Sequence, residues 1–156
     1  MNKYWLTKPL NHQTTNLEIT KKAIKIWFVI STIIRSSILH WRGFANGKFD
    51  ARIDDGLELT DCRITNAVKC LPPANKPLPA EVRACNGFLA ADLAALPAGG
   101  AILALGRIAH DATLRALGRR PSSLAFAHGA RHALDSGAML FDSYHCSRYN
   151  TNTRRL

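Results

Sequence analysis

Apolar residues gather along the chain in short runs that predict buried strands. Ala101–Leu105 is uninterrupted and is closed by Gly106, and Met139–Tyr144 is the last such run. Ile64–Val68 is a shorter β-prone run, and the prolines after it exclude regular structure between Leu71 and Pro79. Short apolar runs with turn residues at their ends are typical of strands buried on both faces.

Two segments between these runs have the periodicity of helices. The first begins near Pro79 with Glu81 in its first turn, and its apolar stripe is Val82, Cys85, Leu89, Leu93 and Leu96. The second covers Arg107–Leu117 and is stopped by Gly118, and its expected inward residues are Ile108, Ala109, Ala112 and Ala116. The alternation of strands and helices predicts an α/β fold with a parallel sheet. Ligands of such sheets bind beyond the carboxyl ends of the strands, where Asn66 and His145 are expected.

The first forty residues differ in composition from the rest. Residues 1–40 contain seven Ile, one Ala and no Gly, whereas residues 41–156 contain four Ile, twenty-one Ala and all ten Gly. Such an abrupt shift predicts two segments of different origin, a leader over 1–40 and a domain over 41–156.

The most hydrophobic run of the leader is Ala23–Leu39, which Lys25 and Arg35 interrupt. Its uninterrupted part, Ile26–Ile34, is far shorter than the roughly 20 residues that a membrane-spanning helix needs. No small-residue cleavage site follows it, which disfavours a signal peptide. We expect a buried strand or helix of the core, with a helix lying on a membrane surface as the alternative.

Charge and composition narrow the class of protein. The chain has 156 residues, which fits one domain, and its 8% aromatic and 21% charged residues exclude wholesale disorder. The net charge of +10 predicts a polyanionic partner, either nucleic acid or an anionic membrane. Four cysteines without a secretory signal are not a secreted disulfide framework, so we expect a cytoplasmic protein.

Candidate chemistry is concentrated near the end of the chain. Ser143–Arg155 is rich in hydrogen-bond donors and contains no acid, which suits a loop that contacts phosphates and base edges; a solvated chain end is the alternative. His128 and His132 are expected as ordinary turn or surface histidines. The spacing of Cys70 and Cys85 is by itself weak and fits two half-buried thiols, and no CxxC pair supports a zinc ribbon.

Taken together, five blocks in this order resemble the iron–sulfur uracil-DNA glycosylases, especially the double-strand-active type 5 branch. The blocks are Ile64–Pro77, Cys85-Asn86, Leu103–Ala112, Phe126–Gly129 and Ser143–Arg155. The resemblance covers residues 41–156. It implies a three-layer α/β/α fold with a short parallel sheet.

The resemblance also implies roles for individual residues. Asn66 matches a position that hydrogen-bonds a flipped uracil, and His145 matches the histidine that donates to the uracil carbonyl as the base departs. The positions that match the loop entering the DNA duplex are Ser147, Arg148 and Asn150. Cys70 and Cys85 match the second ligand pair of a structural [4Fe–4S] cluster, which needs four thiolates.

Two features of that family are missing here. No cysteine precedes Cys62, so the first ligand pair has no counterpart, and neither does the Gly-Leu-Ala-Pro motif with its water-associated carboxylate. We therefore expect an incomplete domain, truncated at both ends, with impaired hydrolysis of the bond between uracil and deoxyribose. The expected partner is double-stranded DNA that contains uracil or other deaminated bases. We expect the protein to be a monomer and not to bind a membrane. A non-catalytic basic nucleic-acid-binding protein of the same ancestry is the alternative.

Overall fold

The computed structural model describes residues 26–30, 39–40, 42–47, 56–69, 77–145, 150 and 152–153. Its strands are β1 (Ile26–Ile30), β2 (Ala45–Asn46), β3 (Glu58–Leu59), β4 (Cys62–Asn66), β5 (Ala101–Leu105), β6 (Arg131–Ala133) and β7 (Met139–Ser143). Its helices are α2 (Pro79–Ala94), α3 (Arg107–Ala116) and the short 3-10 helix Pro121–Ser123.

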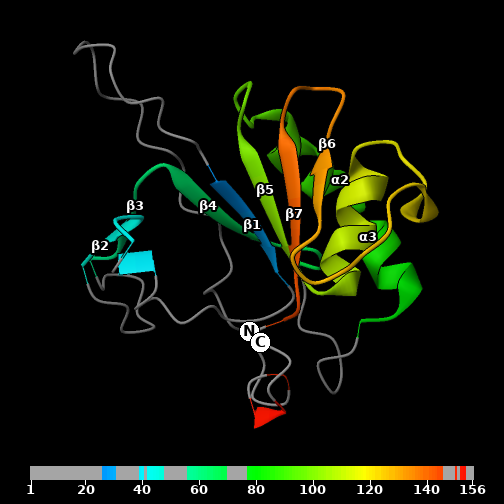
Figure 1. Cartoon of the computed structure of the whole chain (residues 1–156), viewed down its shortest axis with the longest axis horizontal. Helices are drawn as coiled ribbons and strands as arrows, with labels where there is room; N and C mark the ends of the chain where they lie inside the picture. The colour runs from blue at the N-terminus through cyan, green and yellow to red at the C-terminus, as the bar shows by residue number, and fades with distance from the viewer. Residues whose placement is uncertain are drawn as a thin grey trace.

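Five of the strands form one sheet in the order β4-β1-β5-β7-β6 (Figure 1). The first four of these run parallel, and β6 pairs antiparallel with β7 at the edge. The predicted α/β fold with a parallel sheet is therefore confirmed. The edge strand β6 was not predicted, because its three residues are exposed or half-buried and form no apolar run.

Strand β1 lies in the interior of this sheet, between β4 and β5. Its first residue, Ile26, is in register with Cys62 on one side and with Ala101 on the other. The prediction of a core element is confirmed as a strand over Ile26–Ile30, so part of the segment 1–40 belongs to the sheet. Among the residues that the structure describes, no helix has the length and apolar character to cross a bilayer.

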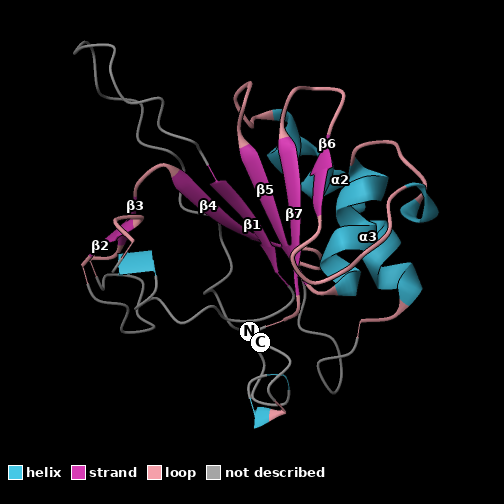
Figure 2. Cartoon of the chain, in the orientation of Figure 1, coloured by secondary structure: helices cyan, strands magenta, loops and turns pink. Residues whose placement is uncertain are grey.

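The two faces of the sheet are covered differently (Figure 2). Helices α2 and α3 pack on the same face, where Ile102, Ala104 and Leu140 join a hydrophobic cluster with residues of both helices. The opposite face carries a smaller cluster around Leu39 and Cys62, which includes residues of the β2–β3 pair. Of the three layers that the resemblance implies, the described residues contain the sheet and one helical layer.

Both predicted helices are present, but the inward face of α3 differs from the prediction. The stripe of α2 is confirmed, with Val82, Leu89 and Leu93 buried. In α3, Ile108 is 40% exposed rather than inward, and His110 is fully buried. Ile108 lies in the first turn beside a cleft, whereas His110, two residues later, faces the sheet. The prediction for Ile108 was therefore wrong, because an apolar residue was preferred over a histidine for the core.

A charged network joins α2 to β4. Asp92 of α2 accepts hydrogen bonds from Arg63 at 2.6 Å, from Thr65 at 2.6 Å and from Lys69 at 2.9 Å. Burial would raise the pKa of the Asp92 carboxyl, but the bonds from Thr65 and Lys69 and the charges of Lys69 and Arg63 outweigh it and lower that pKa. The ionised carboxylate therefore stabilises the contact between helix and strand.

We expect Asp92→Asn to lower the free energy of unfolding at pH 7 by about 1–3 kcal/mol, as loss of charged hydrogen bonds does. Because the folded pKa is lowered, the stabilisation is present above the unfolded value, about 3.9, and is lost as the pH falls through the folded value. Urea unfolding at pH 7 and pH 3 measures both effects. An equal difference between wild type and variant at the two pH values would contradict the assignment.

Candidate functional site

The carboxyl ends of the four parallel strands meet at one edge of the sheet. The register pairs Ile30 with Asn66, Val29 with Ala104 and Leu105 with Ser143. Asn66 and Ser143 therefore lie in one row across the sheet, three strand spacings or roughly 14 Å apart. Two side chains and one pyrimidine ring together can fill such a span.

A cleft of about 360 Å³ opens at this edge, beyond β5 and β7. Its lining residues are Leu105, Gly106, Arg107, Ile108, Phe126, Tyr144, His145 and Asn150. Gly106 turns the chain from β5 into α3 with a φ of 98°, and its N–H donates to Ser143 O at 2.8 Å. Because side chains are strained at such a φ, glycine is needed where the two strand ends meet.

His145 lies in the cleft immediately after β7, as predicted. Its Nε2 atom is buried and has no hydrogen-bond partner among the described residues. Burial lowers the pKa of the His145 imidazole, so the ring is neutral at neutral pH. The backbone carbonyl of His145 accepts a 2.7 Å hydrogen bond from Asn150 Nδ2, which brings Asn150 to the same cleft. A polar atom that is buried without a partner is available to a ligand.

Aromatic rings form one wall of the cleft. The rings of Phe126 and Tyr144 lie 6.1 Å apart, and His128 stacks on Tyr144 at 5.1 Å with an interplanar angle of 9°. The guanidinium of Arg107 lies 5.9 Å from the centre of the Phe126 ring. Flat apolar surfaces beside a cationic group suit a nucleobase attached to a phosphate backbone.

Asn66 ends β4 on the same edge of the sheet. Its Oδ1 atom is buried and lacks a hydrogen-bond partner in the described part of the chain, as His145 Nε2 does. Two of the predicted site residues thus leave polar atoms unsatisfied at the carboxyl ends of the strands. Asn66 lies on β4, outside the set of residues that line the cleft beside His145.

The cysteines do not form a complete cluster site among the described residues. The sulfur of Cys85 accepts a 3.5 Å hydrogen bond from the backbone of Lys69, which places it next to the segment leading to Cys70; Cys70 itself lies outside the described residues. Cys62 is on the other face of the sheet, where its thiol donates to Phe44 O at 3.4 Å. Burial, aided by the charge of Asp61, raises the pKa of Cys62 to about 11, so it stays a thiol. Of the four thiolates that a [4Fe–4S] cluster needs, the described residues include those of Cys62 and Cys85, which lie on opposite faces of the sheet.

The predicted DNA-facing residues are only partly described. Ser147 and Arg148 lie outside the described residues. Of the other basic residues in the described part of the chain, Arg115 and Arg120 lie near the end of α3 that is remote from the cleft, and Arg119 pairs with Asp135 at 3.3 Å. The exposed arginine at the cleft is Arg107, in the first turn of α3.

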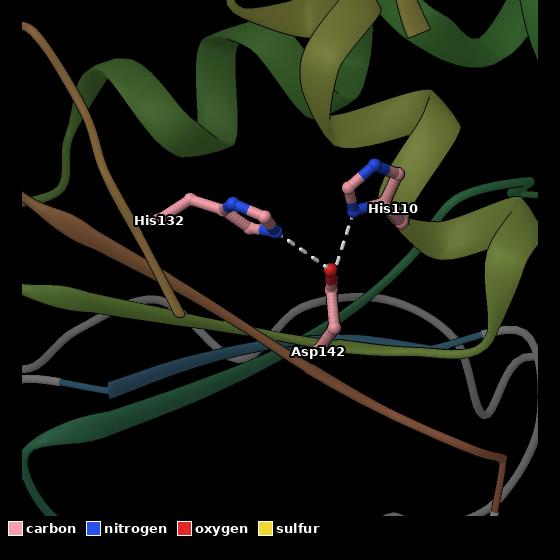
Figure 3. A group of neighbouring side chains, drawn as sticks. All are labelled: His110, His132 and Asp142. Carbon is pink, nitrogen blue, oxygen red and sulfur yellow. Dashed lines mark hydrogen bonds and ion pairs between the residues drawn. The ribbon is translucent and has the colours of Figure 1, made fainter. Parts of the chain in front are cut away.

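Three polar residues with no role predicted from the sequence meet (Figure 3), behind the cleft-lining residue Phe126, whose ring contacts that of His110. Asp142 of β7 contacts His110 Nδ1 through Oδ1 at 2.9 Å and His132 Nε2 through Oδ2 at 3.2 Å. His132 is therefore not an ordinary surface histidine, and that prediction was wrong. Its strand was not predicted, so nothing indicated that its ring would lie next to Asp142.

Comparison with known proteins places these features in a family. Residues 21–156 match the family described as "Uracil DNA glycosylase superfamily". A type-5 uracil-DNA glycosylase of Thermus thermophilus is 44% identical over 119 residues, which are 76% of this chain and 54% of that protein. The Pyrobaculum aerophilum enzyme of the same name is 40% identical over 114 residues, 73% of this chain and 49% of that protein. The chain thus spans about half the length of these curated relatives.

Proposed function

The chain belongs to the uracil DNA glycosylase superfamily, and on this basis we propose that it takes uracil, flipped out of double-stranded DNA, into the cleft beside His145. Asn66 and His145 are the proposed base-binding residues. Ser147, Arg148 and Asn150 are the proposed contacts to the DNA around the flipped base. Cytoplasmic DNA repair is the proposed setting, in keeping with the free thiols of Cys62 and Cys85.

The unsatisfied His145 Nε2 atom is the observation that supports this proposal most directly. It is buried at the carboxyl end of β7, in a cleft with an aromatic wall. In the proposed complex the neutral ring donates a hydrogen bond to a carbonyl oxygen of the base. Unstacking the base from the duplex costs a few kcal/mol, which stacking on Phe126 or Tyr144 and the polar contacts would offset.

Hydrolysis would break the bond between the uracil nitrogen and C1′ of the sugar. The bonding electron pair leaves with the base and spreads onto its carbonyl oxygens, where a hydrogen bond from His145 stabilises the charge. Water adds to C1′, and its proton passes through solvent to the uracil anion, which leaves an abasic sugar and neutral uracil. None of the described residues that line the cleft is an Asp or Glu that could assist that water, so we propose that hydrolysis by this chain is slow.

The same observation favours a second candidate function, binding of uracil-containing DNA without catalysis. This second function uses the same cleft for the base and the same net charge of +10, but it requires no activated water. The two functions differ in whether uracil is released, but both require binding of the flipped uracil. Binding of uracil-containing DNA is therefore the property that tests the proposal.

We expect the chain to bind a duplex with one G·U mispair several-fold more tightly than the same duplex with G·T. Both mispairs are weak, so the difference reports contacts to the flipped base. His145→Ala and Asn66→Ala should each reduce the preference by about 2–10-fold, the effect of one hydrogen bond. Competition binding by fluorescence anisotropy measures it, with His40→Ala, next to Leu39 on the opposite face of the sheet, as the matched control. Equal affinity of the wild type for both duplexes would contradict the proposal.

A further inference from the structure

The side chains of His110, His132 and Asp142 bring three metal-ligating atoms together beneath the cleft. The atoms lie within 4.8 Å of one another, on α3, β6 and β7 (Figure 3). The side chains of His110 and Asp142 are fully buried, and that of His132 is 14% exposed. A carboxylate held away from water in this way requires a positive charge beside it.

Hydrogen bonding determines which atom of His110 faces the carboxylate as an acceptor. His110 Nε2 lies 3.1 Å from the carbonyl oxygen of Leu124, which can only accept, so Nε2 carries the hydrogen. In the neutral ring the lone pair of Nδ1 then points at Asp142 Oδ1, 2.9 Å away. Two acceptors at this distance repel each other unless a cation, either a proton or a metal ion, lies between them.

We propose that His110 Nδ1, His132 Nε2 and the Asp142 carboxylate bind a divalent transition-metal ion, with zinc as the best match. Zinc takes imidazole nitrogens and carboxylate oxygens at about 2.0–2.2 Å, which requires ligand atoms roughly 3.3 Å apart. The contacts of 2.9 and 3.2 Å need to open by a few tenths of an ångström, and the remaining spacing among the three ligand atoms, within 4.8 Å, needs to close toward 3.3 Å. A ligating histidine that donates its other N–H to a backbone carbonyl, as His110 does to Leu124, is the usual outer-shell arrangement of such sites.

The position of the site indicates a structural role. Asp142 is two residues before Tyr144, and the His110 ring contacts that of Phe126 at 5.6 Å between centres. A metal ion would tie β7 and β6 to α3 directly behind the aromatic wall of the cleft. The site differs from any cluster site at Cys70 and Cys85 in its ligands.

The test uses the full chain, freed of metal with a chelator and then titrated with zinc or cobalt. We expect close to one zinc per chain and a visible cobalt band without the near-ultraviolet absorption of cobalt–thiolate bonds. At a free zinc concentration 100-fold above the Kd, Tm should rise by roughly 5–10 °C. Thiolate absorption, or a Tm that neither zinc nor chelator changes, would overturn the proposal and leave a proton between His110 and Asp142.

Two variants separate metal binding from folding. His132→Gln alters the half-buried ligand, and Asp142→Asn keeps the shape of the buried one. Both should lose bound zinc and the zinc-dependent rise in Tm, while His40→Gln, outside the cluster, should retain both. If His132→Gln folds and still binds one zinc as the wild type does, the site is elsewhere and the proposal fails. If both variants fail to fold, the cobalt spectrum of the wild type still decides between nitrogen–oxygen and thiolate ligands.

Discussion

Release of uracil from a duplex by this chain should be about 10²–10⁴-fold slower than release by the Thermus thermophilus relative assayed beside it. General acid–base assistance contributes a factor of this size, and the part of the cleft lining that the structure describes contains no carboxylate. Because His145, the proposed donor to the departing base, is present in the cleft, the deficit is expected in the activation of water. Alkali cleavage of the abasic product, followed over time at enzyme excess, measures the rate of the chemical step.

His145→Ala is the control for this prediction. If the slow wild-type signal is background, the variant should give the same signal. Rapid turnover that disappears in His145→Ala would contradict the prediction and require a carboxylate from elsewhere in the chain. Asp54 and Asp55, which lie outside the described residues, are the first to substitute in that case.

Binding to DNA should weaken roughly 40-fold between 50 and 200 mM salt if about three phosphates are neutralised. Each phosphate contact contributes about 0.9 to the slope of log K against log salt. Among the described arginines, Arg107 lines the cleft, whereas Arg115 and Arg120 are near the far end of α3. Arg107→Gln should therefore reduce the slope by about 0.9, measured by anisotropy at several salt concentrations.

Arg120→Gln is the matched comparison, because it removes the same charge from an exposed position remote from the cleft. We expect its slope to equal that of the wild type within error. A slope that changes equally in both variants would show that net charge, rather than a DNA surface around the cleft, controls affinity. If salt had no effect on the affinity at all, phosphate contacts could not be the main source of DNA binding.

The local pattern of apolar residues and turn residues was enough to predict the helices and strands whose formation is determined by residues close together in the sequence. Ala101–Leu105 was predicted with the bounds of β5, and α2 begins at Pro79 as its proline and first-turn glutamate indicate. The predicted run Ile64–Val68 is shifted by two residues from β4, which is Cys62–Asn66. The prediction followed the apolar residues, whereas the strand is defined by its hydrogen bonding to β1. The edge strand β6 gains its pairing from β7, and nothing in its own three residues indicates that partner.

The residues of the candidate site also differ in whether local sequence could predict them. His145 could be predicted because it follows an apolar run that ends at the ligand-binding edge of a parallel sheet. The cluster of His110, His132 and Asp142 could not, since its members share no motif and meet only through the pairing of β6 with β7 and the packing of α3.

The interior position of β1 has a consequence for the order of folding. Its hydrogen-bonding partners, β4 and β5, are synthesised tens of residues later, so the strand emerges from the ribosome long before either edge can be paired. Parallel pairing between such distant segments is slow to form. Both edges of this apolar strand are open until Cys62–Asn66 has been made, and one edge stays open until Ala101–Leu105 follows. Such an unpaired strand is prone to aggregation and suited to chaperone capture.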